Sequence, residues 1–203
     1  RYRSSAASDV YKRQGYTDKK ASEEKVVKNV LVEGDRWFNT GDLVKTMDVG
    51  FSLGREHYQF VDRVGDTFRW KSENVSTNEV AEILNSFEHV NMANVYGVKV
   101  PKSEGRAGMV AFNCNLDEFN WDDFSSFVID KLPSYAQPIF VRIIEELETT
   151  GTFKLKKNDL REEAYHLDKV NGNQVFIKKP GQNTYVPLDR DYYEVIESGQ
   201  AGF

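Results

Sequence analysis

The spacing of apolar and polar positions along the chain predicts short helices that alternate with short strands. Residues 21–32 carry apolar side chains with the spacing of a helix face, at Val26, Val27, Val30 and Leu31. We therefore expect a helix of three turns there, ended by the glycine at position 34. Aromatic and β-branched residues in 58–61 and 67–70 instead predict two strands joined by a turn.

The clearest helix signal in the chain begins at Ser76, three residues before Glu79. This spacing of serine and glutamate is a capping box, which satisfies backbone donors at the start of a helix. The residues that follow place one apolar face on the helix, at Val80, Ile83, Leu84 and Phe87. A second helix is predicted after Asn120, with an apolar face formed by Trp121, Phe124, Phe127 and Val128.

The rest of the pattern completes an α+β fold. Strands are expected at 93–100, 109–114 and 139–144, helices at 158–166 and 191–198, and hairpin turns at 101–105 and 180–181. Helices that flank a small, mostly antiparallel sheet account for this order of elements. The expected organisation is a β-rich segment in residues 15–65, the last part of a larger domain, followed by a small domain in 66–203.

Composition narrows the class of protein. The 203 residues include 27 Lys and Arg and 32 Asp and Glu, a net charge of −5, which argues against a chain that wraps nucleic acid. Cys114 is the single cysteine and the three histidines are scattered, so we predict neither a disulfide framework nor a metal site. Because no apolar run reaches about 20 residues and no secretory signal is present, we expect a protein that is not secreted.

The first fourteen residues stand apart from the rest of the sequence. Residues 4–14 resemble a translated adapter from a sequencing library, and such segments are excluded from arguments about the fold. A polar disordered leader would give the same expectation. We therefore expect residues 1–14 to be disordered and the authentic chain to begin near Gly15, inside a longer protein.

Three segments carry candidate chemistry. Asp42 follows a glycine turn, where a carboxylate can accept hydrogen bonds from neighbouring hydroxyls such as those of a ribose, although such turns are common. Residues 60–75 mix charged and aromatic side chains, as a binding hairpin or a solvated sheet edge would. Lys154 follows a loop of threonines and Gly151, and its ammonium could pair with phosphate and carboxylate oxygens. This spacing is not that of a P-loop.

Taken together and in this order, these segments resemble signatures of the adenylate-forming superfamily, which includes acyl-CoA synthetases, luciferases and peptide-synthetase adenylation domains. Their amino-acid sequences are similar to those of one branch, the fatty-acid transport proteins and very-long-chain acyl-CoA synthetases. The resemblance covers residues 15–203 and is carried by Trp37-Phe38-Asn39-Thr40-Gly41-Asp42, Gly65-Asp66-Thr67-Phe68-Arg69-Trp70-Lys71, Glu73-Asn74-Val75-Ser76-Thr77, Thr150-Gly151-Thr152-Phe153-Lys154 and Tyr185-Val186-Pro187-Leu188.

The resemblance implies an ATP-dependent ligase for long-chain or very-long-chain fatty acids. Such an enzyme forms an acyl-adenylate and pyrophosphate, and CoA then displaces AMP to give acyl-CoA. It uses ATP, Mg²⁺ and CoA, and the Mg²⁺ site would lie in an upstream part of the parent protein. Lys154 would be the catalytic cation between the acyl carboxylate and the α-phosphate, and Asp42 and Arg63 would bind ATP and AMP.

The resemblance also assigns a hinge and a CoA-binding segment. Asp66 would be the hinge about which the small domain rotates between the two half-reactions. The residues that would then meet CoA are Arg69, Lys71, Ser72 and Glu73. Ser72 departs from the family, which usually has glycine there, and a positive φ at this turn would cost stability.

Other interpretations of the sequence stay open. The substrate could be another carboxylate, such as a bile acid or a carnitine-like acid, because the acyl pocket would lie upstream. The small domain could instead be a non-catalytic binding module, although such a module has no need of Lys154. We expect the chain alone to be inactive. We expect its parent to act in the cytoplasm or in peripheral association with the cytoplasmic side of a membrane.

Overall fold

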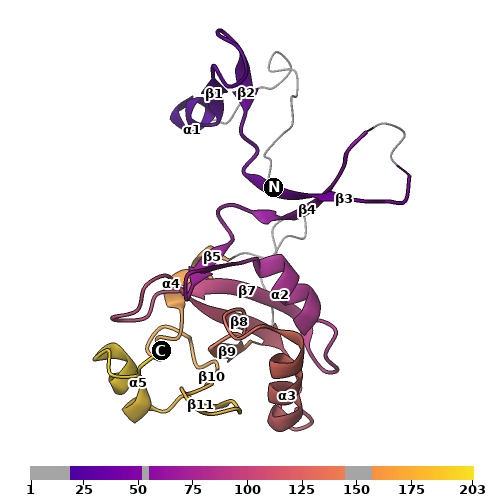
Figure 1. The fold of residues 1–203 in the computed structure, drawn as a ribbon. Helices are drawn as coiled ribbons and strands as arrows, with labels where there is room; N and C mark the ends of the chain where they lie inside the picture. The colour runs from indigo at the N-terminus through magenta and orange to yellow at the C-terminus, as the bar shows by residue number, and fades with distance from the viewer. Residues whose placement is uncertain (1–18, 52–54, 145–156) are drawn as a thin grey trace. The chain divides into compact units, whose positions relative to one another are not determined.

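The computed structural model describes residues 19–51, 55–144 and 157–203 (Figure 1). The predicted leader at 1–14 and the segment that contains Lys154 lie outside the described residues. The chain divides into two compact units, Arg1–Gly65 and Asp66–Phe203, here called unit 1 and unit 2. Their assignment to two domains of a larger enzyme stays a prediction.

Unit 1 is built from short two-stranded antiparallel sheets. One sheet pairs β1 with β2, and the other pairs β3 with β4. The elements described in unit 1 are α1 (Lys19–Glu24), β1 (Val26–Lys28), β2 (Arg36–Phe38), β3 (Asp42–Met47) and β4 (His57–Arg63). The β3–β4 pairing shifts register between Leu43 and Val44, as at a β-bulge.

The predicted helix at 21–32 is wrong beyond its first turns. The helix α1 ends at Glu24, and Val26 and Val27 instead enter β1. β-Branched side chains favour strands, and the chain turns back after Asn29, which has a φ of 57°. The carboxylate of Asp35 fixes this turn, because it accepts hydrogen bonds from the backbone N–H groups of residues 30–32 and from Trp37 Nε1.

Unit 2 contains one five-stranded sheet in the order β11-β10-β9-β8-β7 (Figure 1). Neighbouring strands are antiparallel except β8 and β9, which are parallel and are linked through α3. The elements described in unit 2 are β5 (Phe68–Trp70), β6 (Glu73–Val75), α2 (Thr77–Leu84), β7 (Asn91–Val98), β8 (Ala107–Asn113), α3 (Trp121–Lys131), β9 (Phe140–Ile143), α4 (Asn158–Glu163), β10 (Val175–Ile177), β11 (Val186–Pro187) and α5 (Arg190–Glu197). The predicted α+β class, with a mostly antiparallel sheet, is confirmed.

Two predicted helix starts in unit 2 are confirmed by their caps. Ser76 Oγ accepts a hydrogen bond of 3.2 Å from the N–H of Glu79 at the start of α2. Asn120 caps α3 in the same way, through the N–H groups of residues 122 and 123. The helix predicted at 158–166 is shorter than expected and ends at Glu163 as α4. The next residue, Ala164, has a φ of 46°, which is not compatible with a continuing helix.

Aromatic side chains fill the core between α3 and the sheet. Phe124 is fully buried, and the ring of Trp121 stacks on Phe176 with 3.9 Å between ring centroids. A buried polar group joins this apolar core to α4, because the guanidinium of Arg142 pairs with Glu163 at 2.6 Å. Arg142 also donates to Asn173 Oδ1 at 2.9 Å, so its charge is both paired and hydrogen-bonded inside the fold.

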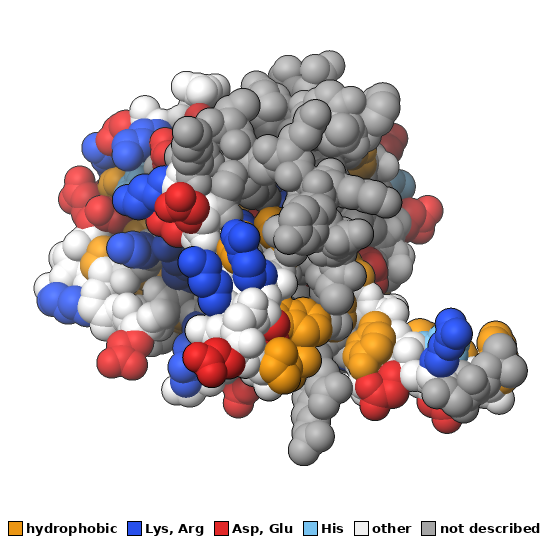
Figure 2. All heavy atoms as spheres, turned by 90° about the horizontal axis from the view of Figure 1, so that it is seen from above, with side chains coloured by type: hydrophobic (Ala, Val, Ile, Leu, Met, Phe, Trp, Pro, Cys, Tyr) orange, Lys and Arg blue, Asp and Glu red, His pale blue; other side chains and the backbone are white. Residues whose placement is uncertain are grey.

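Unit 1 leaves large apolar side chains at the surface. Orange hydrophobic side chains reach the surface among acidic and basic ones in Figure 2. The exposed large hydrophobic residues of unit 1 are Val27, Val30, Leu31, Val32, Met47, Phe51, Tyr58, Phe60 and Val64. In the described part of unit 2, the exposed large hydrophobic residues are Met92 and Ile129.

Candidate functional site

The first pair of predicted site residues meets across one pair of strands. In the antiparallel register of β3 and β4, Asp42 lies opposite Arg63. Arg63 Nε is 3.7 Å from Asp42 Oδ1, with about a third of the Asp42 side chain and well over half of the Arg63 side chain exposed. The turn before Asp42 is held by Val64, whose N–H donates to the carbonyl of Gly41 at 2.8 Å. The structure therefore presents a carboxylate and a guanidinium side by side at an accessible strand end.

Lys25 is a further cation beside this pair that the sequence did not indicate. The N–H of Asn39 donates to the carbonyl of Lys25 at 2.7 Å, which brings the two segments together. A Cβ atom added to Gly41 would lie 3.1 Å from Lys25 Nζ, so glycine leaves room for the ammonium. Gly41 also has a φ of 75°, which glycine adopts without steric cost.

The second group of predicted residues lies on the hairpin of β5 and β6. Lys71 and Ser72 form its two-residue turn, with φ values of 49° and 66°. Positive φ at both central positions is what a type I′ turn requires. Ser72 therefore holds a left-handed conformation that costs free energy for any residue with a Cβ atom.

This hairpin is fixed to the sheet by its inward side chains. Phe68 and Trp70 are buried, and the N–H of Arg106 donates to the carbonyl of Arg69 at 2.7 Å. A Cβ atom on Gly105 would lie 2.1 Å from that same carbonyl oxygen, so this approach requires glycine. The predicted CoA residues Arg69, Lys71, Ser72 and Glu73 are exposed on a firmly anchored support.

The predicted hinge residue is bound to the helix that follows the lysine segment. Asp66 Oδ1 accepts a hydrogen bond of 2.9 Å from Arg161 on α4. Lys157, which precedes α4, donates to Thr77 Oγ1 at 2.8 Å at the start of α2. Lys154 lies outside the described residues. The structure shows instead how the chain is anchored three residues later, at Lys157.

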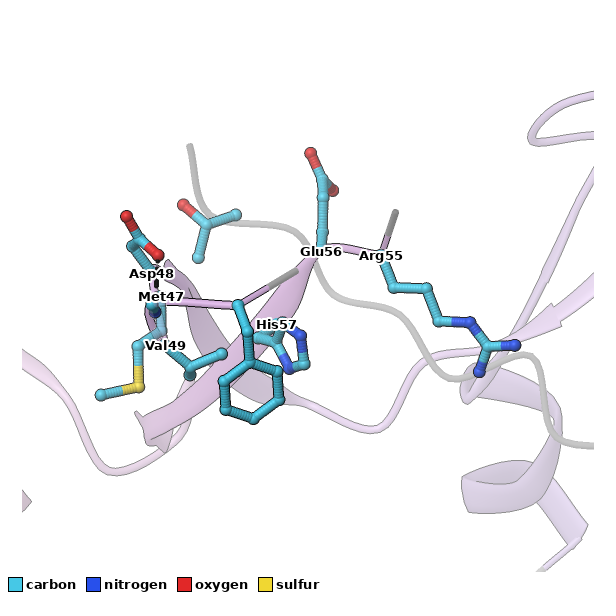
Figure 3. Close-up of a pocket in the computed structure, with 9 residues that line it drawn as sticks. Met47, Asp48, Val49, Arg55, Glu56 and His57 are labelled. Atoms are coloured by element: carbon cyan, nitrogen blue, oxygen red, sulfur yellow. Dashed lines mark hydrogen bonds between the residues drawn. The ribbon is translucent and has the colours of Figure 1, made fainter. Parts of the chain in front are cut away.

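A hollow of about 570 Å³ lies at the far end of the β3–β4 hairpin. Figure 3 shows the Arg55 side chain pointing away from Asp48 and Glu56. The ring of Phe51 meets His57 edge-on, with 5.9 Å between centroids. None of the predicted site residues that the structure describes lines this hollow.

Metal-binding clusters and membrane-spanning helices are both absent from the residues that the structure describes. No group of three or more His, Cys, Asp or Glu side chains in that part of the chain could hold a metal ion. No helix described here is both long and apolar enough to cross a membrane.

Comparison with known proteins decides the family. The chain is 42% identical over 187 residues to the medium/long-chain-fatty-acid–CoA ligase FadD6 of Mycobacterium tuberculosis, covering 92% of this chain and 30% of that protein. It is 41% identical to long-chain fatty acid transport protein 2 of Rattus norvegicus, covering 90% and 28%. The chain belongs to the adenylate-forming superfamily, in its fatty-acid-transport-protein branch.

Solved structures of this superfamily share the fold. A fatty acyl-CoA synthetase of Mycobacterium tuberculosis matches with a TM-score of 0.51 and 23% identity, over 71% of this chain and 26% of that one. The AMP complex of the O-succinylbenzoate-CoA synthetase MenE from Bacillus subtilis matches with a TM-score of 0.56 and 22% identity, over 75% and 27%. These matches show the fold of the small C-terminal domain of adenylate-forming enzymes.

Two further findings concern the family. No protein-family model matches the sequence. Isopenicillin N epimerase component 1 of Hapsidospora chrysogena is also 38% identical over 194 residues, covering 89% of this chain and 31% of that protein. The chain spans less than a third of the length of these relatives.

Proposed function

We propose that this chain is part of an ATP-dependent fatty acyl-CoA ligase. The enzyme joins a long-chain or very-long-chain fatty acid to CoA through an acyl-adenylate and releases pyrophosphate and AMP. The identity of 42% to a fatty-acid–CoA ligase over 92% of the chain carries this proposal. Because the reaction needs ATP and CoA, we place it in the cytoplasm or on the cytoplasmic side of a membrane.

In this proposal the pair at the end of β3 and β4 binds the nucleotide. The carboxylate of Asp42 accepts hydrogen bonds from the two ribose hydroxyls, which are neighbouring donors of matching spacing. The guanidinium of Arg63, 3.7 Å from that carboxylate, orients it and adds a contact to the nucleotide. The proposed Mg²⁺ site is the one that the resemblance implies, in the part of the parent protein upstream of this chain.

Lys154 is the proposed catalytic residue of the first step. Its ammonium pairs with the acyl carboxylate and the α-phosphate, where negative charge accumulates as the acyl-adenylate forms. A fixed cation lowers the barrier because it stabilises that charge more in the transition state than in the bound substrates. The bonds of Lys157 to Thr77 and of Arg161 to Asp66 support this role, since they anchor the segment that follows Lys154.

Rotation about the junction of Gly65 and Asp66 is the proposed link between the two half-reactions. The division of the chain into two compact units between these residues supports this hinge. Glycine adopts a wider range of backbone angles than other residues, and nothing lies within 4 Å of a Cβ atom added to Gly65. Rotation would withdraw Lys154 and bring the β5–β6 hairpin, with Arg69, Lys71, Ser72 and Glu73, to CoA.

A second candidate is a CoA ligase for a carboxylic acid that is not a simple fatty acid. The identity of 38% to isopenicillin N epimerase component 1 favours it, because that relative bears a name unrelated to fatty acids. Bile acids and carnitine-like acids belong to this alternative. The nucleotide and CoA residues would keep the same roles, and the acid-binding pocket would differ.

The test separates the two half-reactions in the full-length protein. Acyl-adenylate formation is followed by pyrophosphate release with a panel of carboxylic acids, and thioester formation is followed from supplied acyl-adenylate and CoA. Lys154→Ala should slow adenylate formation about 100-fold or more, as loss of a group that stabilises the transition-state charge does. Thioester formation from supplied acyl-adenylate should be retained.

The matched control is Lys131→Ala, which removes an exposed ammonium from the end of α3. It should leave both half-reactions unchanged. If Lys154→Ala forms acyl-adenylate at the wild-type rate, the lysine is a surface residue and the proposed mechanism fails. Activity with bile or carnitine-like acids, and not with fatty acids, would select the second candidate.

A further inference from the structure

Lys178 is a half-buried cation that the proposed roles do not use. It follows β10 directly, and its N–H donates to the carbonyl of Ile139 at 2.9 Å. Its ammonium donates to the amide oxygen Oε1 of Gln137. The other end of this amide, Nε2, donates to the carbonyl of Leu132 at 2.8 Å, which fixes Oε1 toward Lys178. A neutral acceptor thus holds the ammonium in place and leaves its charge uncompensated.

The turn of the β5–β6 hairpin belongs to the same part of unit 2. A Cβ atom added to Gly108 would lie 3.3 Å from Phe68 Cζ and 3.4 Å from Pro138 Cα. The base of the hairpin and the segment at 137–138 therefore meet at this glycine, and Lys71 lies at the tip of that hairpin. Burial first, and then the positive charge of Lys71, lower the pKa of Lys178.

No acidic side chain neutralises these two cations in the described structure. The ion pairs found among residues 19–51, 55–144 and 157–203 include neither Lys71 nor Lys178. The next residue, Lys179, is already engaged, because its ammonium lies 4.1 Å from the ring centroid of Tyr192. Two cations that lie in one part of a fold repel each other, and an anion bound between them relieves that repulsion. Lysine ammonium groups are suited to phosphate oxygens as compact point charges.

We propose that Lys178 and Lys71 together bind a phosphate group of CoA, with Gln137 as the residue that positions Lys178. This inference rests on the proposed function, because CoA is the phosphorylated cosubstrate of the second step. CoA carries a 3′-phosphate and a diphosphate linkage, and both have the chemistry that this pair recognises. The site adds the cation that follows β10, distant in sequence, to the hairpin of β5 and β6.

The experiment measures the thioester-forming step of the full-length protein with supplied acyl-adenylate and increasing CoA. Lys178→Met keeps the apolar stem of the side chain and removes its charge. It should raise the KM for CoA about tenfold, the usual effect of losing a charge-assisted hydrogen bond. The kcat of this step and the rate of adenylate formation should stay within about twofold, because the residue does not touch the reacting atoms.

Two variants control for folding and for net charge. Lys179→Met makes the same change in charge one residue further along and should leave the KM for CoA at its wild-type value. Lys178→Arg keeps the cation and should restore most of the affinity lost in Lys178→Met. Lys71→Met should raise the KM for CoA as Lys178→Met does, and the double variant should show non-additive effects because both residues act on one group.

Dephospho-CoA identifies the phosphate that is bound. If the pair binds the 3′-phosphate, wild type and Lys178→Met will have the same KM for dephospho-CoA. If it binds the diphosphate, the tenfold difference will persist with dephospho-CoA. An unchanged KM for CoA in Lys178→Met, in a protein that still makes acyl-CoA, overturns this inference and leaves the proposed function standing. Failure of the wild-type protein to form acyl-adenylate or acyl-CoA with any acid would instead overturn both.

Discussion

Unit 1 and unit 2 differ in what holds their elements together. Every buried hydrophobic side chain among the described residues belongs to unit 2, from Phe68 onward. Unit 1 has short paired strands, exposed apolar side chains and turns fixed by polar groups such as the carboxylate of Asp35. Packing therefore determines the structure of unit 2, and local hydrogen bonds determine much of what is described in unit 1.

The same difference separates the two groups of site residues. Arg69 and Lys71 lie on a hairpin whose inner side chains, Phe68 and Trp70, are buried in the core of unit 2. Asp42 and Arg63 lie on a pair of strands that has no buried hydrophobic side chain among its described residues, and their own contact of 3.7 Å is accessible to solvent. Accessible ion pairs contribute little to stability. We infer that the pair in unit 1 is available for a ligand and the hairpin in unit 2 serves as a fixed support.

The largest expected effect is on the free energy of unfolding, when a leucine of each unit is shortened to alanine. Leu84 on α2 is fully buried, and Leu31 in unit 1 is 72% exposed. Leu84→Ala should lower the free energy of unfolding by about 3 kcal/mol, because it leaves a cavity in the core. Leu31→Ala should change it by less than about 0.5 kcal/mol. Urea-induced unfolding followed by circular dichroism measures both, and equal losses would show that unit 1 has a core of its own.

The sequence predicted unit 2 well because local and tertiary signals agree there. At α2 and α3 a capping side chain precedes an apolar face, and the structure shows both the caps and the buried faces. In residues 21–32 helical spacing occurs without a core to bury it. The turn that Asp35 fixes and the pairing of Val26 with Phe38 prevail over that spacing. Hydrophobic periodicity therefore predicts a helix reliably only where the apolar face packs against a core, because that packing supplies most of the stability of a helix.

The candidate site was predictable in part for a similar reason. Asp42 and the β5–β6 hairpin lie within short motifs, and the positive φ of Ser72 follows from a two-residue turn. Lys178 and Arg161 could not be found in this way. Their partners Gln137 and Asp66 are 41 and 95 residues away in the chain, so the contacts arise from tertiary packing alone.

A smaller effect is expected at the turn of the hairpin in unit 2. Ser72 has a φ of 66°, which glycine adopts without a steric cost. Ser72→Gly should therefore raise the free energy of unfolding by about 0.5–1 kcal/mol, after the larger entropy of glycine in the unfolded chain is subtracted. Ser103→Gly is the matched control, since Ser103 has no positive φ, and it should be neutral or slightly destabilising. A loss of stability in Ser72→Gly would mean that the Ser72 side chain makes a contact worth more than the strain.

The smallest effect concerns the turn in unit 1 and is local. Desolvation opposes ionisation of Asp35, but hydrogen bonds from Trp37 and from the backbone of residues 30–32 lower its pKa from 3.8 to about 2. A carboxyl group with a lowered pKa stabilises the fold above its unfolded pKa, and that stabilisation is lost as the pH falls from 3.8 toward 2. The protection of β1 and β2 amides against exchange, relative to the unfolded chain at the same pH, should fall over that range, while the core strands of unit 2 stay protected. Asp35→Asn should accelerate exchange in β1 and β2 at neutral pH, and Asp48→Asn, which changes the turn after β3, should not. If exchange in β1 and β2 does not respond to acid or to Asp35→Asn, strand pairing rather than this carboxylate holds the turn. Unit 1 would then depend less on local side-chain hydrogen bonds than we infer here.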